Sequence, residues 1–156
     1  MNIILDWYKK VSLSDTSTLA TAALLGNIGQ LLISQEVKDQ HMIGTFKPLI
    51  LETNAMVAEV EHFHTTSVEL SSDMLSHWKL DSQLTQVLRY TYDLANAPGE
   101  FKALSTALYV IFHTVPLAGK GIDESVVTDM MILLKELNFN PEPYRAAVHK
   151  QLEKQK

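Results

Sequence analysis

Four titratable residues near the middle of the chain, Glu59, Glu61, His62 and His64, are of the types that bind zinc. Two ligands share one face of a helix when they lie three or four residues apart, whereas His62 and His64 lie two apart and point in different directions. We therefore predict a helix end with partly exposed histidines at this point, and no zinc site.

Three further patterns could carry chemistry. Asp73 and His77 have the spacing of two ligands on one helical face, but no third ligand is visible, so we expect a surface pair. The sequence GKG at 119–121 lacks the earlier glycine, the preceding strand and the following Ser or Thr of a phosphate-binding loop, and we expect a turn. No G-x-S-x-G nucleophile elbow occurs, which argues against a serine hydrolase of that type.

Apolar residues recur at helical spacing along almost the whole chain. Capping residues, Pro and Gly divide it into segments. The first predicted helical segments are 16–35, capped by Ser14 or Asp15, and 43–63, as one or two helices with Pro48 in a first turn. The next are 66–78, capped by Thr65 or Thr66, and a helix from Asp81 or Ser82 to before Asn96. The last are 100–115, a helix capped by Asp123, and 141–156. The strand-like run LYVIF at 108–112 lies inside a longer helical pattern. We predict an all-α, compact multi-helix bundle of about six to eight helices, with 1–156 forming a single domain.

The bulk composition limits the class of protein. Apolar residues make up 46% and charged residues 20%, as in globular proteins. There is no cysteine, so disulfides and thiolate metal sites are excluded. The net charge of -5 disfavours nucleic acid as a partner. We found no signal-type start and no uninterrupted apolar run of membrane-spanning length, so we expect a cytoplasmic protein without a membrane partner.

A small polar break interrupts the apolar stretch TLATAALLGNIGQLLIS at 18–34. Its centre, Gly26 to Gly29, predicts that two helices meet there instead of one long helix. Taken alone, the break has a local interpretation, in which Gly26 ends a helix and Asn27 and Gly29 turn the chain.

Three segments in order resemble the HDOD family, a branch of the HD phosphohydrolase superfamily found in bacterial signalling proteins. The stretch AALLGNIGQLLIS is similar to the family's aGLLHDIGklvl, with the His-Asp pair replaced by Gly26-Asn27. Residues 59–93 are similar to the family's pattern of a glutamate, a metal-ligand-type histidine, a W-x-L helix pair and a His-His pair. The apolar segment FKALSTALYVIFHTV resembles the helix that follows in the family. The resemblance implies an HD-like fold in which Trp78 and Tyr90 are core residues.

The resemblance also implies where a metal site would be. Aligned on Trp78, the family's ligand histidine falls on Ser67, the glycine four residues on falls on Ser71, and the His-His pair falls on Thr91-Tyr92. Hydroxyl and amide oxygens are weak, neutral ligands, so metal-dependent hydrolysis is not expected here. We predict no catalytic residues, no bound metal and no cofactor. Asn27, Ser67, Thr91 and Tyr92 are the candidate contacts of a vestigial cleft, which we expect the bulk of Tyr92 to fill.

The resemblance implies a non-catalytic signal-transduction module that acts by recognising a partner protein. The alternative is a residual metal-dependent phosphohydrolase or nucleotide-binding domain, and a third possibility is a purely structural oligomerisation domain. Family members usually carry a helical N-terminal half, of which little precedes Gly26 here, so we expect a shortened relative or a fragment that retains the C-terminal, HD-like part. We therefore also expect homo-oligomers, formed through apolar surface near residues 1–35 or along the last two helices.

Overall fold

The computed structural model describes residues 2–115 and 121–154. Over these ranges the chain forms ten α-helices and no strand. The helices are α1 (Asn2–Tyr8), α2 (Leu13–Leu25), α3 (Gly29–Asp39), α4 (Ile43–Glu52), α5 (Ala55–Phe63), α6 (Ser67–His77), α7 (Ser82–Arg89), α8 (Gly99–Thr114), α9 (Glu124–Glu136) and α10 (Glu142–Glu153).

The all-α prediction is confirmed, and the strand-like run at 108–112 lies within α8. The predicted break also holds, because α2 ends at Leu25 and α3 begins at Gly29. The prediction of six to eight helices is wrong, since the described ranges contain ten. The sequence reasoning missed α1, which is a single short amphipathic element, and left open whether 43–63 divides into α4 and α5. The last residues of the predicted terminal helix, 155–156, and most of the GKG sequence lie outside the described residues.

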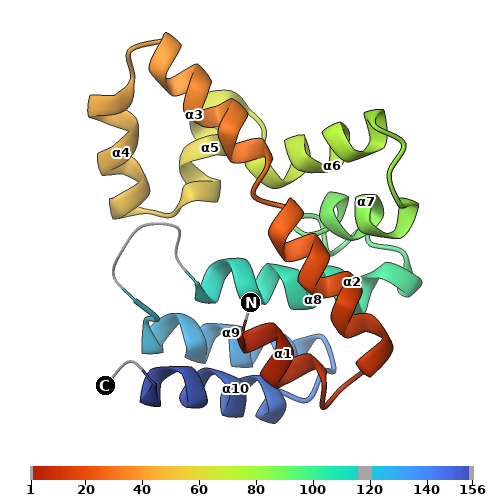
Figure 1. Ribbon diagram of the computed structural model, residues 1–156. Helices are drawn as coiled ribbons and strands as arrows, with labels where there is room; N and C mark the ends of the chain where they lie inside the picture. The colour runs from red at the N-terminus through yellow and green to blue at the C-terminus, as the bar shows by residue number, and fades with distance from the viewer. Residues whose placement is uncertain (1, 116–120, 155–156) are drawn as a thin grey trace.

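The long helix α8 runs through the middle of the molecule (Figure 1). At one end α1 packs against α10, which also contacts α9, and at the other end α3, α4 and α5 come together (Figure 1). The main core collects fully buried side chains from helices far apart in the sequence. They include Ile4, Leu19, Leu75, Leu108 and Tyr144.

A second, smaller apolar cluster forms where α3, α4 and α5 meet. Its buried members are Ile33, Val37, Phe46 and Ala58. The helices of this cluster connect to the main core chiefly through the contact between α3 and α6. The position of α3 on α6 therefore decides how this end of the molecule sits on the rest.

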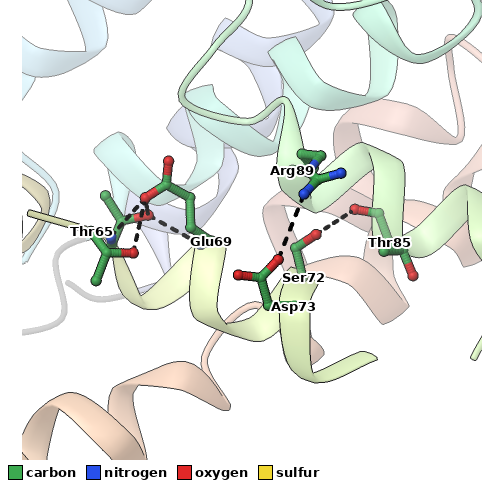
Figure 2. A network of polar contacts seen from close by, with 7 residues as sticks. Thr65, Glu69, Ser72, Asp73, Thr85 and Arg89 are labelled. Atoms are coloured by element: carbon green, nitrogen blue, oxygen red, sulfur yellow. Dashed lines mark hydrogen bonds and ion pairs between the residues drawn. The ribbon is translucent and has the colours of Figure 1, made fainter. Parts of the chain in front are cut away.

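Side-chain caps fix where several helices begin. Thr66 and Glu69 form a capping box at the start of α6, in which Glu69 N–H donates to the Thr66 hydroxyl (3.1 Å) and Thr66 N–H donates to the Glu69 carboxylate (2.9 Å) (Figure 2). Asp81 and Asp123 cap α7 and α9, as predicted. The expected cap at Ser14 or Asp15 is wrong: the hydroxyl of Ser12 accepts from the N–H of Asp15, so α2 begins earlier.

Two polar contacts join α6 to α7 (Figure 2). The hydroxyl of buried Ser72 donates to the Thr85 carbonyl (3.0 Å), and exposed Asp73 lies 3.8 Å from Arg89. The surface position predicted for Asp73 is confirmed, but the predicted pairing with His77 is wrong, because Asp73 pairs with Arg89. Exposed ion pairs of this kind contribute about 0–1 kcal/mol to the free energy of unfolding.

Two expected core aromatics are not in the core. Trp78 is 52% exposed and Tyr90 is partly exposed. The buried face of α6 runs through Val68 and Leu75, and the helix ends at His77, so Trp78 lies beyond the core as the residue that ends the helix. Tyr90 occupies the equivalent position at the end of α7.

The expectation that Pro48 lies in a first turn is also wrong, because Pro48 is the sixth residue of α4. A proline at this position cannot donate to the carbonyl of Gly44. Both residues are exposed, so water can satisfy that carbonyl instead.

The segment Leu13–Asp39, taken as one piece, is long and apolar enough to cross a membrane by length and composition alone. Core helices of globular proteins pass the same test. In this fold the segment is bent into α2 and α3, and the bend packs against α6 through buried backbone and hydroxyl groups.

Candidate ligand pocket

A cavity of about 340 Å³ lies where α2 meets α3, next to the start of α6 and the end of α8. Three of the four residues singled out from the sequence, Asn27, Ser67 and Tyr92, line it. They come from the bend after α2, the first turn of α6 and the segment after α7, so the fold brings together positions 65 residues apart in the chain.

Thr91 is placed differently from the other three. It is fully buried, and its hydroxyl donates to the carbonyl of Val87 (2.8 Å) within the preceding turn. It is not among the lining residues. Thr91 therefore anchors the end of α7 and offers no free group to a ligand.

The expectation that Tyr92 fills the cleft is wrong. Tyr92 forms part of the wall, where its ring makes edge contacts with Tyr109 and His113 at centroid distances of 5.7 and 5.9 Å. Tyr109 and His113 are themselves stacked at 3.9 Å. These rings hold the phenol against α8, which leaves the cavity open.

The bend between α2 and α3 is fixed by Ser71. Gly29 N–H donates to the Ser71 hydroxyl (2.8 Å), and that hydroxyl lies within donating distance of the carbonyls of Gly26 (2.9 Å) and Ser67 (2.8 Å). A single side chain of α6 thus satisfies two buried backbone groups of the polar break, the Gly29 N–H and the Gly26 carbonyl. This arrangement places Asn27 at the rim, where its amide donates to the Ala23 carbonyl.

Glu59 is the lining residue that sequence reasoning missed. It is 4% exposed, and its carboxylate accepts from the backbone N–H of Ser67 (2.7 Å) at the start of α6. The signal available in the sequence was helical spacing. Glu59 lies four residues from both Ala55 and Phe63 and shares their inner face, whereas Glu61 is exposed.

Burial governs the protonation of the titratable groups around the cavity. It raises the pKa of Glu59, an effect that the hydrogen bond from Ser67 partly offsets. Burial also raises the pKa of Tyr92, with a further contribution from the charge of Glu59. In contrast, burial lowers the pKa of His113, whose Nδ1–H donates to the Tyr109 carbonyl (2.9 Å). The site therefore disfavours charge on each of these groups in the absence of a partner.

Histidines elsewhere occupy structural positions. His62 donates from Nδ1 to the carbonyl of Ala58 (3.2 Å), and exposed His64 ends α5 in the left-handed conformation with φ of 55°. This confirms the predicted helix end with partly exposed histidines. Over residues 2–115 and 121–154, no three His, Asp or Glu side chains gather closely enough to share a metal ion.

Comparison with known proteins agrees with the all-α fold. A model of the HDOD domain matches residues 7–94, which is more than half of the chain. A search of curated proteins found no match. Among solved structures, the chain is similar to a virulence factor, cj0248, from Campylobacter jejuni subsp. jejuni, with a TM-score of 0.73 and 18% sequence identity. The similarity covers 94% of this chain and 56% of that one, so this chain spans little more than half of that protein. On the family match, the chain belongs to the HDOD domain family.

Proposed function

We propose that this chain is a non-catalytic HDOD module of signal transduction, and that it acts by binding another protein. The observation that carries the proposal is the chemistry of the cavity at the positions aligned with the family's ligands. Those positions hold an amide at Asn27, a hydroxyl at Ser67 and a phenol at Tyr92. Metal-assisted hydrolysis needs several imidazole and carboxylate ligands that bind an ion and activate its water.

Among the described residues that line the cavity, the one carboxylate already has a structural role. Glu59 accepts from the first N–H of α6 and so satisfies a group that the helix itself leaves unpaired. The hydroxyl of Thr91 also has a structural role, because it donates to the carbonyl of Val87. Glu59 and Thr91 are thus both engaged in holding helices in place, and this favours a scaffold over a catalyst.

The surface of the α3–α5 end supports recognition of a protein. Large apolar side chains exposed on these three helices could bury substantial area against a partner. They are Leu31, Leu32, Ile43, Leu51, Val57 and Val60.

A pair of matched variants tests the protein-binding part of the proposal. Leu31 on α3 and Leu13 at the start of α2 are 72% and 73% exposed, so Leu31→Glu and Leu13→Glu should perturb folding equally little. We expect a partner captured from the native cell by the wild-type chain to be retained by Leu13→Glu and lost by Leu31→Glu. Capture of the same proteins by all three chains would refute binding through α3. A concentration-dependent sedimentation pattern without any client would instead favour an oligomerisation domain.

A second measurement tests the absence of catalysis. The purified chain is incubated separately with manganese, iron, zinc and magnesium, and bound metal and hydrolysis of phosphate esters are measured. We expect neither stoichiometric binding nor turnover. Turnover that disappears in Asn27→Ala or Glu59→Gln would overturn the proposal in favour of a residual phosphohydrolase.

A further inference from the structure

We propose that the cavity beside Glu59 binds a compact organic cation that joins an apolar or aromatic body to a planar N–H donor group such as an amidinium or guanidinium. This goes beyond the proposed protein-binding function, whose apolar docking surface on α3, α4 and α5 lies outside the cavity, so protein binding would survive its failure. The argument uses the shape of the cavity, the acceptor capacity of Glu59 and the charges of the residues around it.

The cavity has the size and lining of a small-molecule site. Its volume of about 340 Å³ lies within the usual range for ligand pockets, about 300–1,000 Å³. Apolar side chains from five helices line it, among them Leu24, Met56, Val68, Phe112 and Val126. A few polar groups lie among them, as is typical of pockets that fix a ligand's orientation.

Glu59 retains acceptor capacity toward a ligand. Its carboxylate is engaged by Ser67 at the start of α6, through the backbone N–H at 2.7 Å. A carboxylate has about four lone-pair positions, so much of its capacity is left. A planar amidinium presents parallel N–H donors that match a carboxylate, and such charge-assisted contacts are stronger than neutral ones.

The charges around the cavity select for a cation. Among the described residues that line it there is no Lys or Arg, and Glu59 is the one carboxylate. A phosphate or another carboxylate would therefore be repelled by Glu59 and find no Lys or Arg partner, and burial lowers the pKa of the lining imidazole of His113, which disfavours its cationic form. A divalent metal would find a single carboxylate with amide, hydroxyl and imidazole groups, too few anionic ligands for its charge.

The protonation preferences of the site agree with this selection. Burial raises the pKa of Glu59, so the empty cavity disfavours its charged form. A bound cation would restore that charged form through direct attraction in a region shielded from water. Tyr92 and Phe112 add aromatic surface on which a flat cation can pack.

Three probes of one shape test the proposal: benzamidine, its neutral relative benzamide and its anionic relative benzoate. Saturation-transfer NMR and titration calorimetry measure the binding of each. We expect benzamidine to bind the wild-type chain at least tenfold more tightly than benzamide, and benzoate to bind more weakly still.

Two variants locate the binding. Glu59→Gln keeps an oxygen that can accept from Ser67 but removes the charge, and we expect it to weaken benzamidine binding at least tenfold while leaving benzamide unchanged. Glu61→Gln is the matched control, because Glu61 lies on the same helix but is exposed and does not line the cavity. If Glu59→Gln does not fold, Ala55→Leu provides the test, since added bulk on the lining residue Ala55 should weaken benzamidine binding without changing the charge.

Four results would overturn the proposal. They are the absence of benzamidine binding at millimolar concentration, benzamidine binding unchanged in a folded Glu59→Gln, benzamidine binding unchanged in Ala55→Leu, and benzoate binding as tight as that of benzamidine.

Discussion

Replacement of Gly29 by alanine should destabilise the protein, because α3 touches α6 at this residue with no room for a side chain. A Cβ at Gly29 would lie 1.9 Å from the carbonyl oxygen of Ser67, 2.8 Å from its carbonyl carbon and 3.0 Å from the Cβ of Leu70. The first two atoms belong to the backbone of a buried helix and cannot move aside by changing a rotamer. The two helices must separate by roughly 1 Å to relieve the contact.

The expected loss follows from three contributions. Overpacking of this kind costs typically about 1–3 kcal/mol and occasionally more, and a contact with backbone belongs at the upper end. Separation of the helices also stretches the buried hydrogen bond from Gly29 N–H to the Ser71 hydroxyl, now 2.8 Å long, whose loss costs about 1 kcal/mol. Alanine returns about 1 kcal/mol through its higher helix propensity. The net expected change in the free energy of unfolding is a loss of about 3 kcal/mol.

Gly44 is the matched control for this substitution. It also lies in a helix, but a Cβ there would meet no atom within 4 Å. Gly44→Ala should therefore gain about 0.5–1 kcal/mol through propensity alone. Urea unfolding followed by circular dichroism measures both changes. A Gly29→Ala variant within 0.5 kcal/mol of the wild type, or two variants that change stability in the same direction, would refute the close contact between α3 and α6.

Three further predictions concern buried polar groups. Ser71→Ala should lower the free energy of unfolding, measured in urea, by about 1–3 kcal/mol, because it leaves the Gly29 N–H buried without an acceptor. Ser76→Ala, on the exposed face of α6, should change that free energy little. Because burial raises the pKa of Glu59 above its ordinary 4.5, the folded chain holds this proton more tightly than the unfolded chain. The free energy of unfolding should therefore fall as pH rises from about 4.5 through the folded pKa. In Glu59→Gln, the melting temperature measured in thermal melts should change less with pH across that window. In the same unfolding assay, Thr114→Val should lower the free energy of unfolding more than Tyr144→Phe. Thr114→Val removes the donor to the Val110 carbonyl (2.6 Å) and also leaves the buried Tyr144 hydroxyl without its partner at 2.8 Å, whereas Tyr144→Phe removes that second contact alone.

Most of the fold could be predicted from spacing and caps. The starts of α6, α7 and α9 follow from Thr66, Asp81 and Asp123, whose side chains accept from the first turn of each helix. These signals are local, so one sequence suffices to read them. The break at Gly26 to Gly29 could be predicted for the same reason, because glycine at both ends of a short polar stretch interrupts an apolar helix.

The errors concern how helices pack against one another. Trp78 was expected in the core because the family resemblance implies it, but α6 ends before it and leaves it half exposed. Glu59 was considered only as a possible zinc ligand near His62 and His64, whereas the approach of α5 to the start of α6 makes it a buried acceptor. Tyr92 was expected to fill the cleft because of its volume, yet contacts with Tyr109 and His113 hold it in the wall. Each outcome depends on partners distant in sequence, which periodicity does not identify.

The break between α2 and α3 is held by contacts within the protein itself. Gly26 and Gly29 are buried, and the bend between them is held by the hydroxyl of Ser71 and by direct contact with the backbone of Ser67. None of these contacts requires a metal ion, so the helix junction is stable with Gly26-Asn27 where the family has His-Asp. Because the same contacts hold the start of α6 beside Glu59, they also maintain the cavity. A side chain at Gly29 would clash with that backbone and cost stability, so the junction beside the cavity depends on glycine at this position.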